Sequence, residues 1–164
     1  MMFLLDVNAL LALQYSTHIH HARVEAWVSG LHAERGEDHV VFATCPITEL
    51  GFVRIASGKA GLAASVAVAR VDLRNVKASQ NMVFIPADIL ARDLPAWVRK
   101  SAQTTDGYLL ALARSHGAYL ATLDRFIPGA VFIPDETSEP LTVREASMHS
   151  VWAVPLRTGH AASQ

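Results

Sequence analysis

The sequence predicts an α/β protein, a three-layer α/β/α sandwich around a central, mainly parallel sheet of about five strands. Short apolar runs alternate along the chain with longer runs of helical periodicity. Each apolar run is continuous, which is expected of a strand that is covered on both faces. Strands that alternate with helices in this way favour a parallel sheet with helices on both sides.

Five short apolar runs are expected to form the strands, and prolines stop two of them. They cover residues 3–5, 40–43, 82–85, 119–122 and 131–133.

Five longer segments have helical spacing of apolar residues. One begins with Pro46, which suits a first helical turn, and another is followed by Gly117, a good C-terminal cap. Residues 87–103 are mixed, because their apolar residues fit a helix but Pro95 interrupts it. The expected helices cover residues 7–13, 21–31, 46–57, 61–76 and 105–116.

The length of 164 residues favours one domain, which we expect over residues 1–134, followed by a partly disordered extension over 135–164. Cys45 is the single cysteine, so an internal disulfide and a cysteine-rich zinc site are both excluded, and a cytoplasmic setting is the default. The apolar N-terminal stretch is interrupted by Asp6 and is too short to cross a membrane. The net charge of −1 argues neither for nor against a nucleic-acid partner.

Four acidic residues fall where this fold would bring them together, beyond the carboxyl ends of the strands. Asp6 ends the first strand, and Asp124 lies just past the fourth. Asp106 opens the helix that leads into the fourth strand, and Glu49 lies in the helix after the second.

Each aspartate taken singly also has a structural explanation. Asp6 and Asp124 suit helix N-caps, and Asp106 suits a first helical turn, where its charge complements the helix dipole. Glu49 is harder to explain structurally, because its neighbours at helical spacing are apolar: Cys45, Phe52, Val53 and Ala56. A glutamate on such a stripe needs a partner, which a metal ion or a basic group would supply.

A hard divalent cation would allow four converging carboxylates to stay ionised, because it offsets their mutual repulsion. Mg²⁺ or Mn²⁺ suits oxygen ligands better than zinc does. An acidic cluster of this kind suits hydrolysis of phosphodiester bonds.

Four segments, each with its flanking apolar residues, occur in a familiar order. They are LLDVNAL from Leu4, ITELGFVR from Ile47, TDGYLLALA from Thr105 and HGAYLATLDR from His116. Over roughly residues 2–134 the chain resembles the PIN-domain family, most closely its VapC-type toxins. No single motif is specific, but the ordered set is.

The resemblance implies a PIN-like fold and a Mg²⁺-dependent endoribonuclease that forms a homodimer and is neutralised by a cognate antitoxin. It implies that the four acids, Asp6, Glu49, Asp106 and Asp124, are the catalytic metal ligands. Asn8 and Thr122 would be supporting polar residues. Arg54 and Arg125 are candidate RNA contacts, with an exposed surface position as the alternative, and the same holds for Lys77.

Two other classes of protein use acids at strand ends. A phosphotransfer receiver domain would want a lysine after a late strand, where this chain has Asp124 and Arg125. A phosphatase of the haloacid-dehalogenase type would want a second aspartate at position 8, which is Asn8. A third alternative, a PIN fold that binds RNA without cleaving it, is disfavoured because all four acids are present.

A short histidine cluster precedes the second helix. His18, His20 and His21 do not have a recognised zinc spacing, so we expect them to be solvated.

Overall fold

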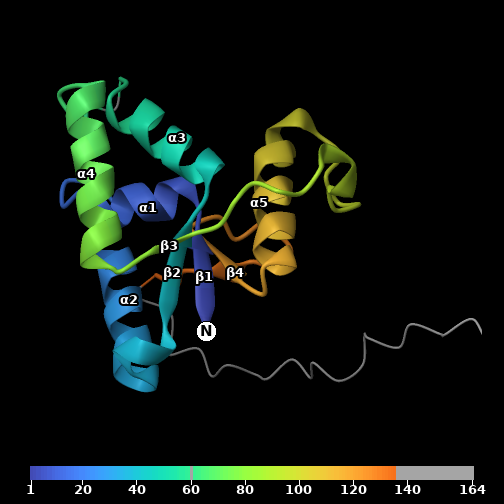
Figure 1. Ribbon diagram of the computed structural model, residues 1–164, viewed down its shortest axis with the longest axis horizontal. Coiled ribbons are helices and arrows are strands. Elements are labelled where there is room, and N and C mark those ends of the chain that lie inside the picture. Colours follow the sequence, from blue (N-terminus) through green and yellow to red (C-terminus); the bar gives the residue numbers. More distant parts are fainter. Residues whose placement is uncertain (60, 136–164) are drawn as a thin grey trace, which may run out of the picture.

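The computed structural model describes residues 1–59 and 61–135 and has a five-stranded sheet at its centre (Figure 1). The strand order is β3-β2-β1-β4-β5, and all neighbouring strands are parallel. The predicted fold class is therefore confirmed. The strands are β1 (Met2–Leu5), β2 (Val41–Thr44), β3 (Val83–Phe84), β4 (Tyr119–Thr122) and β5 (Val131–Phe132).

Helices cover both faces of this sheet, as the apolar strands require. In Figure 1 the first four helices gather on one side of the strands and α5 lies on the other. The α-helices are α1 (Val7–Gln14), α2 (His21–Arg35), α3 (Pro46–Ala56), α4 (Val66–Ser79) and α5 (Thr104–Ser115).

The central strand β1 contributes to two separate cores, because successive side chains of a strand point to opposite faces. Phe3 and Leu5 pack in the core formed with α1 to α4, whereas Leu4 packs in the core formed with α5. All three side chains are nearly completely buried. This burial explains why the run is continuous rather than alternating.

The register brings the carboxyl ends of the central strands to one edge. Leu5 of β1 lies beside Ala121 of β4, and the Asp6 amide donates a hydrogen bond to the Ala121 carbonyl. On the other side, Thr44 of β2 lies beside Phe84 of β3. The chain segments that leave β1, β2 and β4 therefore start close together.

One expected helix starts later than predicted, and the mixed segment 87–103 is resolved into short turns. Helix α4 begins at Val66 rather than at residue 61, because Ser65 caps it by accepting a hydrogen bond from the Val68 amide at 3.2 Å. Residues 87–103 form two short 3-10 turns, Ala91–Asp93 and Ser101–Gln103, rather than a helix.

The prediction that every strand is buried on both faces is wrong for β3. Val83 and Phe84 are 41% and 52% exposed, because β3 is a two-residue strand at the edge of the sheet. Apolar sequence alone does not distinguish an edge strand from a central one.

The apolar side chains of α2 are largely internal. Val28 is buried, and Trp27 and Leu31 pack against the larger core.

Within the described residues, no helix is long and apolar enough to span a membrane. The extension predicted for residues 135–164 lies outside the described part of the chain except for Asp135.

Candidate metal centre

Asp6 stands where β1 ends and α1 begins, with only 9% of the residue exposed. One carboxylate oxygen, Oδ1, accepts a hydrogen bond from the Ala9 amide at 2.6 Å, which is the N-cap interaction predicted for an aspartate at this position. The other oxygen, Oδ2, accepts a hydrogen bond from the Thr122 hydroxyl. The cap holds the carboxylate at the sheet edge.

Thr122 connects two of the predicted acids. It is the last residue of β4 and is fully buried. Its hydroxyl donates to Asp6 and accepts a hydrogen bond from the Asp124 amide at 3.0 Å. One buried hydroxyl thus fixes the Asp6 side chain relative to the backbone of Asp124.

Asp106 lies in the first turn of α5 and is half-buried. Burial raises the pKa of Asp106 above its ordinary value, and the negative charge of Asp124 raises it further. The Asp6 pKa is also raised, chiefly by burial and to a lesser degree by the charge of Asp106, although hydrogen bonds from Thr122 and Ala9 oppose this shift. The three aspartates therefore form one electrostatically coupled group.

Glu49 has a different environment. Its carboxylate accepts a hydrogen bond from the Thr44 hydroxyl at 2.7 Å and forms an ion pair with the ammonium of Lys77 in α4. The Lys77 nitrogen also lies 5.4 Å from the centre of the Phe84 ring. The partner that an acid on an apolar stripe requires is thus a basic group in this structure. Lys77, for which an exposed surface position was the alternative to an RNA contact, is held in this ion pair and is only partly exposed.

The four predicted acids do not form a ready-made cage. Among residues 1–59 and 61–135, no three aspartates, glutamates, histidines or cysteines lie close enough to bind one ion together. Asp6, Asp106 and Asp124 are linked through their charges and through Thr122, and Glu49 is bound by Lys77. The four-ligand site stays a prediction.

The remaining predicted residues are exposed. Asn8 lines a pocket together with Asp124. Arg54 lies in the last turn of α3, and the guanidinium of Arg125 lies 5.9 Å from the centre of the Phe132 ring. All three side chains are accessible to a bound molecule.

The sequence did not indicate Thr44 as part of this region, and it indicated Lys77 as a candidate RNA contact but not as the partner of Glu49. A signal for Thr44 was present, because a threonine directly follows the second apolar run, much as Thr122 ends the fourth. A signal for the pairing of Lys77 was absent, since it lies 28 positions from Glu49 and in a different helix.

Comparison with known proteins agrees with this fold. The model of the PIN domain family matches residues 3–128. The chain belongs to the PIN domain family. The match includes every predicted site residue.

Two relatives of this PIN domain come from Mycobacterium tuberculosis. The chain is 40% identical to ribonuclease VapC38 over 128 residues, covering 75% of this chain and 85% of the relative. It is 36% identical to ribonuclease VapC29 over 145 residues, covering 84% of this chain and 100% of the relative.

A solved structure has the same fold at low identity. The crystal structure of VapBC2 from Rickettsia felis, bound to a DNA fragment from their promoter, aligns with a TM-score of 0.52 and 12% identity. The alignment covers 80% of this chain and 97% of that chain. At this identity the likeness supports the PIN fold alone.

Proposed function

We propose that this PIN domain is a Mg²⁺-dependent endoribonuclease, the toxin of a toxin–antitoxin pair. The observation that carries the proposal is the group of three aspartates at the carboxyl edge of the sheet, where Thr122 holds Asp6 beside Asp124 and charge couples Asp106 to both. The VapC relatives, which are named ribonucleases, support RNA as the substrate.

The donor chemistry of this edge fits a hard divalent cation. All the candidate ligand atoms of Asp6, Asp106, Asp124 and Glu49 are carboxylate oxygens, which Mg²⁺ and Mn²⁺ prefer. Burial and neighbouring carboxylates raise the pKa values of Asp6 and Asp106, so negative charge is costly at this edge, and a bound cation would offset that cost. When bound, the ion would neutralise charge on the phosphodiester and lower the pKa of the attacking water.

The protein's own residues would position this chemistry. Thr122 orients the Asp6 carboxylate, and the helix cap at Ala9 prevents its rotation. Lys77 offsets the charge of Glu49 at the side of β2, which reduces repulsion of an approaching phosphate. Arg54 and Arg125, both exposed, would contact the RNA backbone.

A cleavage assay tests the proposal. The purified chain should cut RNA with Mg²⁺ or Mn²⁺ and stop when EDTA is added. Activity that survives complete chelation would contradict the metal requirement. Hydrolysis confined to phosphomonoesters would favour a phosphatase, and binding of RNA without cleavage would favour a non-catalytic module.

The proposed partners are an antitoxin and a second copy of the chain. Both rest on the likeness to the VapC ribonucleases, and we expect the antitoxin to bind near the acids. Light scattering should give twice the mass of one chain at micromolar concentration, and a small protein should co-purify from the native host. A monomeric mass would contradict the homodimer.

A further inference from the structure

A pocket of about 430 Å³ adjoins the candidate metal centre. It lies between the α1–α2 connection and the loop after β4. Its lining includes two residues already assigned to the centre, Asn8 and Asp124, together with His18, Ile19, His20 and Leu123. Two of the three histidines of the cluster noted in the sequence, His18 and His20, therefore line the same pocket as Asp124.

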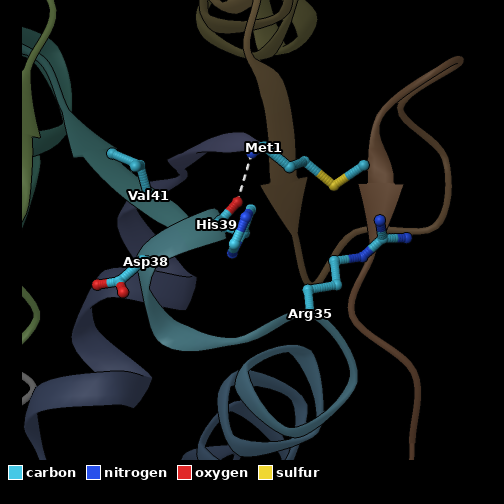
Figure 2. Close-up of a pocket in the computed structure, with 5 residues that line it drawn as sticks. All are labelled: Met1, Arg35, Asp38, His39 and Val41. Carbon is cyan, nitrogen blue, oxygen red and sulfur yellow. Dashed lines mark hydrogen bonds between the residues drawn. The ribbon is translucent and has the colours of Figure 1, made fainter.

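A second pocket lies elsewhere on the molecule, at the amino end of the sheet. It measures about 550 Å³ and is lined by Met1, Arg35, Asp38, His39 and Val41 (Figure 2). None of its lining residues belongs to the candidate centre. It serves as a control, because it presents His39 at the opposite end of the sheet from Asp6, Asp106 and Asp124.

The walls of the first pocket combine flat rings with an exposed apolar side chain. The imidazole centres of His18 and His20 lie 5.8 Å apart at an interplanar angle of 50°. Burial lowers the pKa of His18, with a smaller effect from His20 and His21, which favours the neutral ring. Ile19, between them in the sequence, is 87% exposed.

Hydrogen bonds hold this connection in a defined shape. The His20 amide donates to Nδ1 of His18 at 3.2 Å, and the His18 amide donates to the Tyr15 carbonyl at 2.9 Å. His21 is held separately, because its Nδ1 bonds the Ala12 carbonyl at 2.8 Å. The two rings and Ile19 are thus presented by an ordered turn, which reduces the entropy lost when a ligand binds.

We propose that this pocket is a subsite for one unstacked RNA base next to the bond that is cleaved. Proteins recognise single-stranded RNA by stacking splayed bases on aromatic side chains, histidine included, and by hydrogen bonds to the base edges. His18, His20 and Ile19 supply the stacking and apolar surfaces, and the amide of Asn8 supplies both a donor and an acceptor.

The charges of the pocket favour a base over a phosphate. Asp124, which lines the pocket, carries a negative charge that repels a phosphate, whereas a base carries no net charge. The volume falls in the range typical of small-ligand pockets, roughly 300–1,000 Å³. Because the pocket shares Asp124 with the candidate centre, a base held there places its own backbone beside the acids. The subsite rests on the proposed ribonuclease function.

The test removes one side chain from the protein and one base from the RNA, separately and together. An RNA oligonucleotide that spans a mapped cleavage site is prepared with a single abasic residue at each position in turn. Affinities are measured by fluorescence anisotropy with Mg²⁺, in an Asp106→Asn background that prevents cleavage. One abasic position should weaken binding by about tenfold, as expected for one lost stacking interaction.

The protein variants His20→Ala and Ile19→Ser should reproduce this loss on intact RNA. They should show little further loss with the abasic RNA, because the same contact is removed on both sides. The matched control is His39→Ala, which changes an exposed histidine in the other pocket (Figure 2). This variant should bind intact RNA as tightly as the Asp106→Asn background protein does. Thermal melts establish that each variant is folded.

Two results would overturn the subsite. One is unchanged RNA affinity in folded His20→Ala and Ile19→Ser, and a loss of antitoxin binding in the same variants would then assign the pocket to a protein contact. The other is an abasic penalty that persists in these variants. If the parent chain cleaves no RNA at all, the ribonuclease function itself fails, and this result is distinct from the other two.

Discussion

At the scale of single residues, Asp6 combines a structural and a candidate catalytic role. Its two oxygens bond different groups, the amide of Ala9 and the hydroxyl of Thr122. The structural explanation for this aspartate, a helix N-cap, is therefore confirmed, and it does not exclude ligation of an ion. A buried cap is a rigid support for a ligand, because its orientation is set before the ion arrives.

Asp106 separates the catalytic from the structural interpretation more cleanly than Asp6. We expect Asp106→Asn to abolish most RNA cleavage, since the amide keeps the shape but loses the charge that binds the ion. Mg²⁺ should raise the melting temperature of the parent more than that of the variant, because the ion binds only the native state. Cleavage at the parental rate would show that the site assignment is wrong.

Lys77 and Glu49 form a pair whose side chains are 27% and 24% exposed. Lys77→Met should destabilise the metal-free fold, because Glu49 then keeps only Thr44 as a partner. We expect a loss on the order of 1 kcal/mol in the free energy of unfolding, which lies between the losses for breaking exposed and buried ion pairs. Urea denaturation measures this loss, with the exposed Lys100→Met as control. Equal stability of the two variants would mean that the pair contributes nothing.

The same variant tests whether Lys77 competes with an ion for Glu49. Removing the ammonium leaves the carboxylate charge without its counterion, so Mg²⁺ should stabilise Lys77→Met more than it stabilises the parent. Melting temperatures with and without Mg²⁺ decide this point. An equal shift in both proteins would argue that Glu49 is not a metal ligand.

At the scale of elements, the crossing of α1 and α3 determines how firmly Asp6 is supported. A Cβ built on Gly51 in α3 would lie 2.5 Å from Cγ2 of Val7, the residue after Asp6. Valine is stiff about its first side-chain torsion, so it cannot rotate away cheaply. The close approach of these two helices requires glycine at this position.

Gly51→Ala should therefore destabilise the protein by about 1–3 kcal/mol through overpacking. The matched control is Gly30→Ala in α2, where an added Cβ meets nothing within 4 Å. That change should be neutral or stabilising by up to about 1 kcal/mol, since alanine favours helix. Chemical denaturation of both variants tests the contrast, and comparable stabilities would contradict the packing argument.

At the scale of the whole molecule, the coupled acids make metal-free stability depend on pH. The ordinary pKa of Asp106 is 3.8, and its pKa in the folded protein is higher, so the folded state binds the proton more tightly. Stability from this group is therefore lost as pH rises from about 3.8 through the raised pKa. Above that window the ionised carboxylate destabilises the fold until a cation binds.

Comparing the parent with Asp106→Asn isolates this effect from other titrating groups. In EDTA at neutral pH the variant should be the more stable of the two, and the difference should shrink as pH falls, because the parental carboxyl becomes protonated in both states. Urea denaturation between pH 3 and 8 measures the difference. A variant that is less stable at neutral pH would indicate that Asp106 mainly complements the helix dipole.

The sequence by itself determined the fold class, the approximate positions of all five strands and the presence of acids at their carboxyl ends. These features follow from local patterns: apolar runs, helical spacing and capping residues. The errors were also local in origin. The apolar pair Val83 and Phe84 in an edge strand has the same sequence pattern as a central strand. The apolar pattern before Val66 suggests an earlier start of α4, but the helix begins after its cap, Ser65.

The tertiary structure alone decided which groups meet. Thr122 bonds Asp6 across 116 positions, Lys77 reaches Glu49 from another helix, and His18 and His20 line the same pocket as Asp124. Periodicity reports which face of an element is buried, but not which element lies against that face. A carboxylate's charge, its partners and its pKa depend on those long-range neighbours, because Coulomb interactions and burial are set by distances in space rather than along the chain.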